Sequence, residues 1–167
     1  MAVVQRQGYR EAMARFGAAV SVVTTDGPAG RSGFTASAVC SVTDDPPTLL
    51  VCVNRHNDSH AALLGNRVLC VNTLAAGQQD ISALFGGAAS EQNLRFAAGV
   101  WDTLVTGAPV LQGAVVSFDC RIAQVTEIGT HSVMFAHVVA LRHSAGHDGL
   151  IYFGRGYHPV RRPLPAG

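Results

Sequence analysis

Two short segments of the sequence carry polar side chains in patterns that could bind a ligand. The first is residues 33–39, Gly-Phe-Thr-Ala-Ser-Ala-Val, where small side chains and hydroxyls follow one another on a stretch expected to be extended. Small side chains let a flat molecule approach the backbone, and hydroxyls can hydrogen-bond its polar edge. An edge strand with ordinary Ser and Thr alternation would give the same pattern, so this segment by itself leaves both interpretations open.

The second segment, residues 54–59 (Asn-Arg-His-Asn-Asp-Ser), is expected to open a helix. Free backbone N–H groups at a helix start attract an anion, and Arg55 and the Ser59 hydroxyl would add to that attraction. Simple N-capping by Asn57, Asp58 or Ser59 explains the same residues. The negative charge of Asp58 would oppose a bound phosphate unless its side chain points away.

The common catalytic and metal-binding signatures are missing from the sequence. It contains no GxSxG, HExxH or Walker pattern, and no GxGxxG after a strand. His56 and His60 are four residues apart, as are His143 and His147, but no cysteines or carboxylates accompany them at ligand spacing, which favours a solvated surface. Any redox reaction would therefore need an organic cofactor.

The elements that must position these segments are mainly strands. Apolar residues at helical spacing predict one amphipathic helix over residues 6–17, with these four on one face: Tyr9, Ala12, Met13 and Phe16. Apolar and β-branched runs between turn residues predict strands at 18–25, 31–39, 48–54, 67–74, 114–126, 132–143 and 150–153. Short helices are expected at 59–64, 78–85 and 90–98.

The order of these elements favours an antiparallel architecture. The first two strands flank the turn residues 26–30 and look like a hairpin. The last three strands are separated by hairpin-length spacings, which favours antiparallel pairing over βαβ crossovers. We expect a mainly β fold, a closed or nearly closed antiparallel barrel with short peripheral helices. Residues 1–167 would form a single domain with a C-terminal tail from about residue 155.

Composition restricts the classes of function. Net charge is +1, and no basic run interleaves with aromatic residues, which argues against nucleic-acid binding. No apolar segment approaches the roughly 20 residues of a membrane span, and the N-terminus lacks a signal-peptide pattern, so we expect the cytoplasm. With 48% hydrophobic and only 14% charged residues, some apolar surface is expected to be buried between subunits. The four cysteines form no CxxC pair and are expected to be buried free thiols: Cys40, Cys52, Cys70 and Cys120.

Five stretches, in order along nearly the whole chain, match a known family. They are AAVSVVTTDGPAGRSGFTASAVCSVTDDPPTLLVCVNR (18–55), RVLCVNTL (67–74), ISALFGG (81–87), VSFDCRIAQVTEIGTH (116–131) and GLIYFGRGYHPV (149–160). On these stretches the chain resembles the short-chain flavin reductase family, the reductase components of two-component flavin monooxygenases. Within that family, residues 26–55 are most similar to the FMN reductases of pyrimidine utilisation. The last stretch looks equally like the reductase components of 4-hydroxyphenylacetate 3-monooxygenase.

The resemblance implies a split β-barrel of the FMN-binding type, a homodimer with one flavin per subunit near the dimer interface. It implies isoalloxazine and ribityl contacts from four consecutive residues: Thr35, Ala36, Ser37 and Ala38. The phosphate end would be held by the stretch from Cys52 to Ser59, in particular Cys52, Val53, Asn54, Arg55 and Ser59. By position, the pocket would be completed by Asn72 and by the segment from Ser82 to Phe85.

The resemblance also implies how the nicotinamide donor would bind. It places His131 on the nicotinamide side of the flavin. Without the resemblance, the preferred interpretation of His131 is an ordinary histidine in a turn. Many relatives carry an aspartate before this histidine, where this sequence has Thr130. Residues near the dinucleotide would come from the last strand and the segment after it: Tyr152, Phe153, Tyr157 and His158.

The implied activity is hydride transfer from NADH to FMN or FAD, with the reduced flavin reaching a separate flavin-dependent monooxygenase by diffusion. Nothing in the sequence resembles a clamp for the 2′-phosphate of NADPH, which favours NADH. Two other functions remain open at this point. One is a flavin-binding split-barrel module without turnover. The other is a flavin-dependent reductase of another substrate, such as a cobalt corrinoid, or a relative of pyridoxamine-phosphate oxidase.

Overall fold

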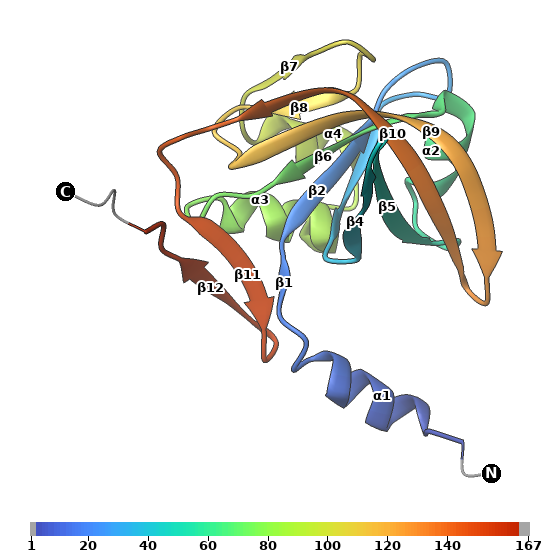
Figure 1. Cartoon of the computed structure of the whole chain (residues 1–167), viewed down its shortest axis with the longest axis vertical. Helices are drawn as coiled ribbons and strands as arrows, with labels where there is room; N and C mark the ends of the chain where they lie inside the picture. Colours follow the sequence, from blue (N-terminus) through green and yellow to red (C-terminus); the bar gives the residue numbers. More distant parts are fainter. Residues whose placement is uncertain (1–2, 164–167) are drawn as a thin grey trace.

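The computed structural model describes residues 3–163 and is built around one curled antiparallel sheet (Figure 1). The sheet has seven strands in the order β3-β2-β6-β9-β10-β5-β4. Their bounds are Ser21–Thr25 (β2), Ser32–Ala36 (β3), Val39–Asp44 (β4), Pro47–Asn54 (β5), Val68–Thr73 (β6), Val116–Ile128 (β9) and His131–His143 (β10). The expected mainly β, antiparallel fold is therefore confirmed.

The sheet is nearly closed because its two edge strands follow each other in the chain. β3 and β4 lie at opposite ends of the strand order, yet only Ser37 and Ala38 connect them. A connection of two residues brings the two edges of the sheet together and leaves a seam at this point. The Ala38 carbonyl oxygen accepts a 3.0 Å hydrogen bond from the backbone N–H of Cys52 on β5, which ties the seam to the sheet.

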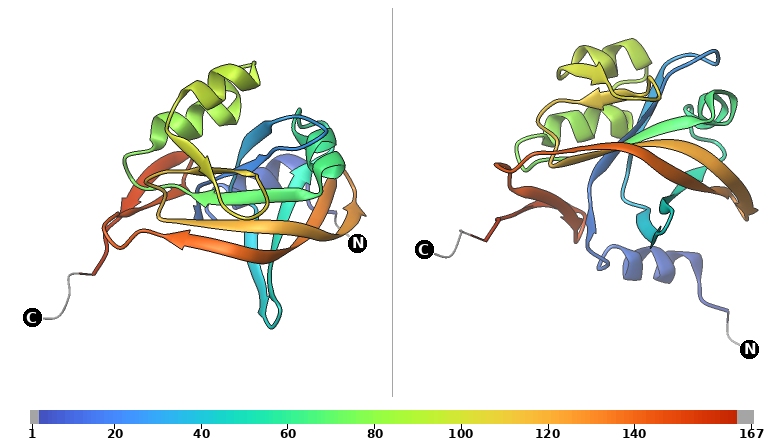
Figure 2. Two further views of the ribbon diagram at one scale, coloured as in Figure 1. Left: turned by 90° about the horizontal axis from the view of Figure 1, so that it is seen from above. Right: turned by 45° about the horizontal axis from the view of Figure 1, so that its top comes forward.

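Among the described residues, two smaller sheets and five helices surround the barrel. β1 (Ala18–Ala19), β11 (Gly149–Phe153) and β12 (Gly156–Val160) form one sheet, and β7 (Trp101–Thr103) pairs with β8 (Pro109–Leu111) in the other. The helices are α1 (Arg6–Met13), α2 (His60–Asn66), α3 (Gln79–Ala83), the π-helix η1 (Leu84–Ala88) and α4 (Gln92–Ala97). Figure 2 shows α3 and α4 together on one side of the sheet, beside the β7–β8 hairpin. Within residues 3–163, every helix is too short or too polar to cross a membrane.

Strand alternation separates the core from the surface that forms the site. On β5, Leu49, Val51 and Val53 are buried in the barrel core, whereas Leu50 and Cys52 are only half-buried. Successive side chains of a strand point to opposite faces, so Leu50 and Cys52 lie on the other side. A second core contains Phe85, Phe96 and the partly buried Trp101, whose ring centroids are 5.1–5.5 Å apart.

Gly33 on β3 is required by the close approach of this aromatic cluster. A Cβ at this position would lie 2.8 Å from Cε1 of Phe85 and 3.1 Å from the carbonyl oxygen of Val23. We expect Gly33→Ala to lower the free energy of unfolding by about 1–3 kcal/mol, the usual cost of overpacking. Each kcal/mol should lower the melting temperature by roughly 2–4 °C, which calorimetry can measure. Gly146→Ala is the matched control because its Cβ meets nothing within 4 Å; equal melting temperatures for the two variants would contradict the steric argument.

Several expectations are wrong at the chain ends. α1 ends at Met13 rather than near residue 17, so Phe16 lies beyond it, and the apolar face of this helix is largely exposed. Residues 156–160, expected in a tail, form β12, because Gly154 and Arg155 both adopt positive φ (60° and 63°) and close a tight hairpin. Of the last three expected strands, β9 and β10 pair with each other, but β11 pairs with β1 and β12 in a different sheet. The β7–β8 hairpin was not expected.

Candidate functional site

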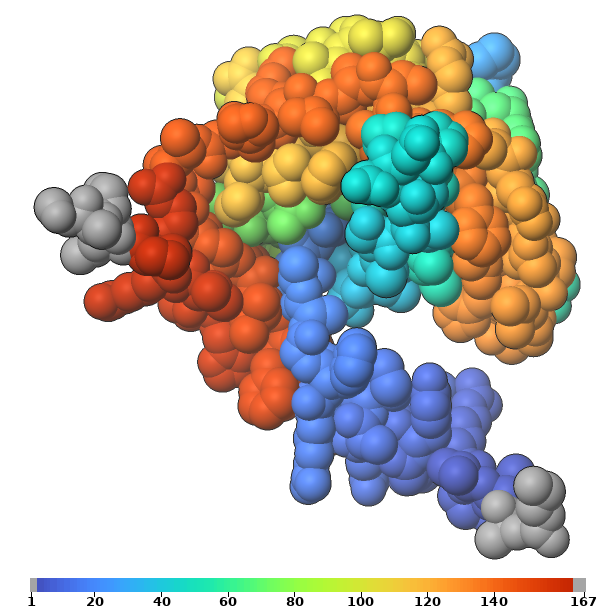
Figure 3. All heavy atoms as spheres, in the orientation of Figure 1, coloured from blue at the N-terminus to red at the C-terminus, as the bar shows by residue number. Residues whose placement is uncertain are grey.

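Three cavities adjoin at the seam between β3 and β4. Their volumes are about 610, 210 and 220 Å³, and Ser37 lines all three. Ser37 is itself exposed, so its side chain faces open space rather than the core. Figure 3 shows the recess between the helix at the N-terminal end and the β4–β5 hairpin, where the largest cavity lies. The point where the sheet fails to close is therefore also the place with room for a ligand.

The largest cavity has mostly apolar walls from three parts of the chain. The residues that line it are Met13, Ala14, Phe16 and Ala18 from the N-terminal segment, Ser37, Ala38, Val39, Cys40, Leu50 and Cys52 from the seam and β4–β5, and Tyr152 and Arg155 from the β11–β12 hairpin. The backbone N–H of Gly154 donates a 2.7 Å hydrogen bond to the carbonyl oxygen of Ala14, which fastens the hairpin to the end of α1. The apolar side chains after and within α1 thus form one wall of this cavity.

The second cavity, of about 210 Å³, joins the seam to the β11–β12 hairpin through hydroxyl groups. The Thr35 hydroxyl donates a 2.7 Å hydrogen bond to the carbonyl oxygen of Ser82. The Ser82 hydroxyl is 2.8 Å from the Tyr157 hydroxyl, and the Tyr157 ring packs 5.3 Å from that of Tyr152. Four residues predicted from the family resemblance, at distant points of the sequence, are therefore neighbours here.

The third cavity, of about 220 Å³, brings the seam together with the end of β5 and the start of β10. It is lined by Phe34, Thr35, Ala36, Ser37, Ala38, Cys52, Asn54, Asn57 and His131. His131 is opposite Asn54 in the β5–β10 ladder, which explains how a residue far along the chain reaches the seam. Its Nδ1 lies 2.9 Å from the Thr130 hydroxyl, so threonine occupies the position where a carboxylate was noted in relatives.

The loop that was expected to offer free backbone N–H groups uses most of them itself. Asn54 Oδ1 accepts a hydrogen bond from the His56 N–H, and Asn57 Oδ1 accepts one from the Ser59 N–H, both at 2.9 Å. The Arg55 N–H donates to the carbonyl oxygen of Thr130. These bonds fix the two asparagine side chains by their oxygens and leave their NH₂ groups as donors. The hydrogen-bond donors left at this end of the cavity are therefore amide NH₂ groups more than backbone N–H groups.

Two of the expected phosphate ligands have partners elsewhere. The Ser59 side chain is fully buried and accepts a 2.8 Å hydrogen bond from the Ser32 hydroxyl. The Arg55 guanidinium donates to the carbonyl oxygen of Gly129 at 2.7 Å and lies 3.6 Å from the Glu127 carboxylate. Both side chains would have to exchange these contacts for a phosphate, so their role in binding stays a prediction.

Three other predicted pocket residues contribute buried side chains. Val53 points into the barrel core, and Phe85 belongs to the aromatic cluster. Asn72 is buried between strands, where its Oδ1 accepts from the Leu111 N–H at 2.9 Å and from the Ser117 hydroxyl at 2.8 Å. The structure places these three side chains behind the walls of the cavities.

The remaining dinucleotide candidates, Phe153 and His158, lie on the two strands of the β11–β12 hairpin. Phe153 and His158 have ring centroids 6.1 Å apart, and His158 Nε2 is 3.0 Å from the Phe153 carbonyl oxygen. Both side chains are exposed next to Arg155, which lines the largest cavity. Neither of them lines a cavity at the seam, whereas Tyr152 and Tyr157 both line the second cavity.

Sequence reasoning missed several residues of the cavity walls. These are Met13, Phe16, Cys40, Leu50 and Arg155. For α1 and the segment after it a signal existed, because an amphipathic face needs something to cover it. For Leu50 the signal was weaker. Alternation along a strand predicts that Leu50 lies on the face opposite to the buried one, but it does not predict what packs against that face.

The expectation of buried cysteines is correct for two of the four. Cys70 and Cys120 are buried, and burial raises the pKa of the Cys70 thiol and raises that of Cys120 to about 12. Cys40 is exposed, which corrects the expectation, because it lies on the edge strand β4 facing the largest cavity. Cys52 is half-buried, and burial, with a smaller effect of Cys40, raises its pKa. In the part of the chain that the structure describes, no three His, Cys, Asp or Glu side chains gather as metal ligands.

Comparison with known proteins decides the family. The sequence profile described as flavin reductase like domain matches residues 13–161. The chain belongs to this family. The family resemblance seen in the sequence is thereby confirmed. The region that matches the flavin reductase like family includes the seam and the β11–β12 hairpin, and it begins at Met13, the last residue of α1.

Relatives in the flavin reductase family match over almost their full length. The chain is 60% identical over 157 residues to the FMN reductase (NADH) RutF of Ancylobacter novellus, covering 94% of this chain and 86% of that protein. A crystal structure provisionally assigned as a flavin reductase, from Haemophilus somnus, has a TM-score of 0.91 and 44% identity, covering 94% of this chain and all of that one (100%). BorF, the flavin reductase component of a bacterial two-component tryptophan halogenase, has a TM-score of 0.88 and 27% identity, covering 95% and 100%. The expected split-barrel fold of the flavin reductases is confirmed.

Proposed function

We propose that this protein is an NADH-dependent FMN reductase, an oxidoreductase that transfers a hydride from NADH to FMN, with FAD as an alternative flavin. The observation that carries the proposal is that three cavities share Ser37 as a lining residue and so adjoin at the seam of the barrel. The 60% identical relative named FMN reductase (NADH) supports the choice of both substrates.

The residues present suit a flavin in size and chemistry. Binding pockets for such ligands have volumes of about 300–1,000 Å³, and the largest cavity, of about 610 Å³, falls in this range. At the seam the side chains of Ala36, Ser37 and Ala38 are small, so a flat ring system can lie against the backbone. Asn54, Asn57 and the Thr35 hydroxyl supply neutral donors and acceptors for its polar edge.

Each part of the site would have a distinct task. When bound, FMN supplies the acceptor atom for the hydride of NADH. The segment 35–38 would fix the plane of the flavin ring, and Leu50 with the side chains of α1 would keep water out. His131 would orient the nicotinamide carboxamide or donate a hydrogen bond near the flavin ring. Tyr152 and Tyr157 would bound the space for the second ring.

Release of reduced flavin to a flavin-dependent monooxygenase is the second element of the proposal. Neutral hydroxyls and amides line the seam, and such a site favours moderate rather than tight binding. The structural relative BorF is named as the reductase component of a two-component system, which supports transfer of the flavin between proteins. We place this reaction in the cytoplasm, where the four free cysteines would remain reduced.

The proposal also includes a homodimer, because apolar side chains of α1 and of the segment after it are exposed in the single chain. Tyr9 is 59% and Phe16 is 69% exposed. In sedimentation we expect a particle of twice 17.4 kDa, and Phe16→Asp should weaken association by at least about 2 kcal/mol, or roughly 30-fold, as expected for a buried aromatic anchor. Gln7→Asp puts the same charge on the opposite face of α1 and should leave the dimer intact. A wild-type monomer at micromolar concentration would refute the dimer.

The test of the function is direct. Purified protein given NADH and FMN in air should consume NADH continuously, because oxygen regenerates the oxidised flavin after release. Omitting FMN should stop the consumption. Flavin binding without NADH consumption would instead support a binding module, and consumption only with another acceptor, such as a cobalt corrinoid, would support a different reductase.

A further inference from the structure

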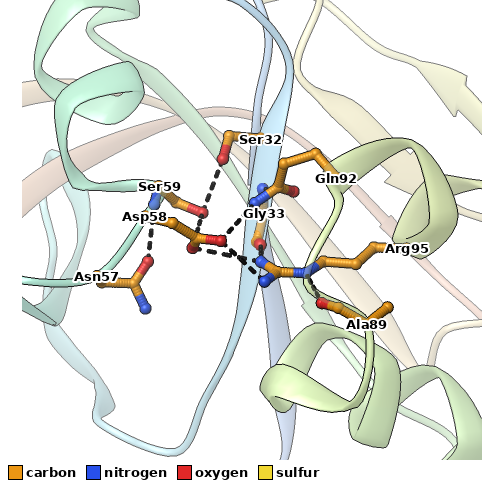
Figure 4. Close-up of polar contacts among 8 residues, drawn as sticks. All are labelled: Ser32, Gly33, Asn57, Asp58, Ser59, Ala89, Gln92 and Arg95. Atoms are coloured by element: carbon orange, nitrogen blue, oxygen red, sulfur yellow. Dashed lines mark hydrogen bonds and ion pairs between the residues drawn. The ribbon is translucent and has the colours of Figure 1, made fainter.

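Arg95 on α4 is a buried charged residue that lies behind the seam rather than in it. Its side chain is 6% exposed, and its Nη2 lies 2.8 Å from Oδ2 of Asp58 (Figure 4). Nη1 donates to the carbonyl oxygen of Gly33 at 2.9 Å, and Nε donates to that of Ala89 at 2.8 Å. A buried arginine is rarely found without a partner, and here the guanidinium reaches three separate segments of the chain.

Gln92, one turn earlier on α4, contacts the same two points. Its Nε2 donates to Oδ2 of Asp58 at 3.2 Å, and its Oε1 accepts from the Gly33 N–H at 3.0 Å. Figure 4 shows the Asp58 side chain directed toward these two α4 side chains. Both hydrogen-bonding groups of the Gly33 backbone and both oxygens of Asp58 are thus held from one helix.

These contacts connect two walls of the third cavity. Gly33 precedes Phe34, a residue of β3 that lines this cavity. Asp58 follows Asn57, which lines the cavity from the loop after β5. Without the contacts of Arg95 and Gln92, the Ser32–Ser59 hydrogen bond would remain to join β3 to this loop. Loss of Arg95 would leave the half-exposed Asp58 carboxylate without a counter-charge, next to the residues expected at the phosphate end. In the sequence, the negative charge of Asp58 counted against phosphate binding by this loop. In the fold, the Arg95 guanidinium compensates that charge.

We propose that Arg95 is a positioning residue of the flavin site, which sets the loop 54–59 against β3 and neutralises Asp58 so that the phosphate of FMN can bind. The proposal rests on the proposed function only for the identity of the ligand. It predicts that Arg95 affects ligands with a phosphate more than ligands without one, because an unpaired carboxylate repels the phosphate and not the ring.

The test compares FMN with riboflavin, which lacks the phosphate, by titration of flavin fluorescence without NADH. Arg95→Gln should raise the dissociation constant for FMN by roughly five- to tenfold more than that for riboflavin, given a charge interaction partly screened by solvent. Adding Asp58→Asn to this variant should return the ratio of the two dissociation constants to within about twofold of wild type, since the repelling charge is gone. Equal losses for both flavins, or no restoration by Asp58→Asn, would show that Arg95 only stabilises the fold.

A second variant tests the same charge effect in case Arg95→Gln does not fold. Gln92→Glu changes a half-buried residue, keeps the acceptor for the Gly33 N–H and adds a carboxylate beside Asp58. It should also weaken FMN more than riboflavin, and an unchanged ratio would overturn the proposal. Arg142→Gln is the matched control, because it breaks the 2.9 Å ion pair with Asp102 between β10 and β7 and should leave the ratio unchanged. Binding ratios do not depend on turnover, so failure of this proposal is distinguishable from failure of the reductase function.

Discussion

Ser37→Leu is expected to lower the affinity for FMN on the order of 100-fold while the fold remains intact. Ser37 is the residue common to the three cavities, and it is exposed at the seam between β3 and β4. A leucine there would project into the space where the cavities meet. Overpacking costs of about 1–3 kcal/mol correspond to roughly 5- to 150-fold in affinity, and a rigid ring has few ways to avoid the clash.

Titration of flavin fluorescence measures this loss, and a thermal melt reports on the fold. Ser41→Leu is the matched control, since Ser41 is equally exposed on β4 but lies outside the three cavities. It should bind FMN as the wild type does. If Ser37→Leu bound FMN with unchanged affinity, the flavin would have to bind away from the seam.

His131→Ala is expected to reduce turnover of NADH and FMN about 100-fold while the affinity for oxidised FMN stays nearly unchanged. His131 lines the third cavity opposite Asn54, whereas the ring of the flavin would be held mainly by the segment 35–38. The histidine would therefore act on the hydride donor or on the reacting edge of the ring. Losing one positioned hydrogen-bonding group should then affect the rate more than the binding of flavin.

Steady-state kinetics at several NADH concentrations separates the two ways in which His131 could act. A lower kcat would indicate a contact made mainly in the transition state, and a higher KM for NADH alone would indicate uniform binding of the donor. His147→Ala, an exposed histidine in the loop between β10 and β11, is the control and should behave as the wild type. Unchanged kinetics for His131→Ala would leave the reductase function standing and show that His131, the first residue of β10, takes no part in the reaction.

Local patterns predicted much of the fold. The β2–β3 hairpin forms as expected across the turn Asp26–Gly30, and β9 pairs with β10 across Gly129 and Thr130. In both cases the signal was local, because β-branched runs flank residues that favour a turn. The family resemblance added the residues of segment 35–38 and His131, which the structure brings together at one cavity.

The direction of a side chain that contacts a segment far away in the sequence could not be predicted from local patterns. Asn72 and Ser59 are polar residues near the expected pocket, yet strand pairing turns Asn72 into the interior and the Ser32 hydroxyl engages Ser59. Conversely, Leu50 was expected only as part of a strand, and it lines the largest cavity. A shift of one residue in a strand reverses the face of a side chain, and periodicity does not show which face meets which partner.

The sequence alone determined the element types, the antiparallel character and, through its resemblance to the flavin reductases, the residues of the seam. Tertiary structure decided where these elements meet. Only the closing of the sheet between β3 and β4 makes Ser37 a shared wall of three cavities, and only the packing of α4 brings Arg95 to Asp58. The physical reason is that hydrophobic periodicity and turn chemistry act over a few residues, whereas strand order and the pairing of a buried charge depend on contacts between segments far apart in the chain.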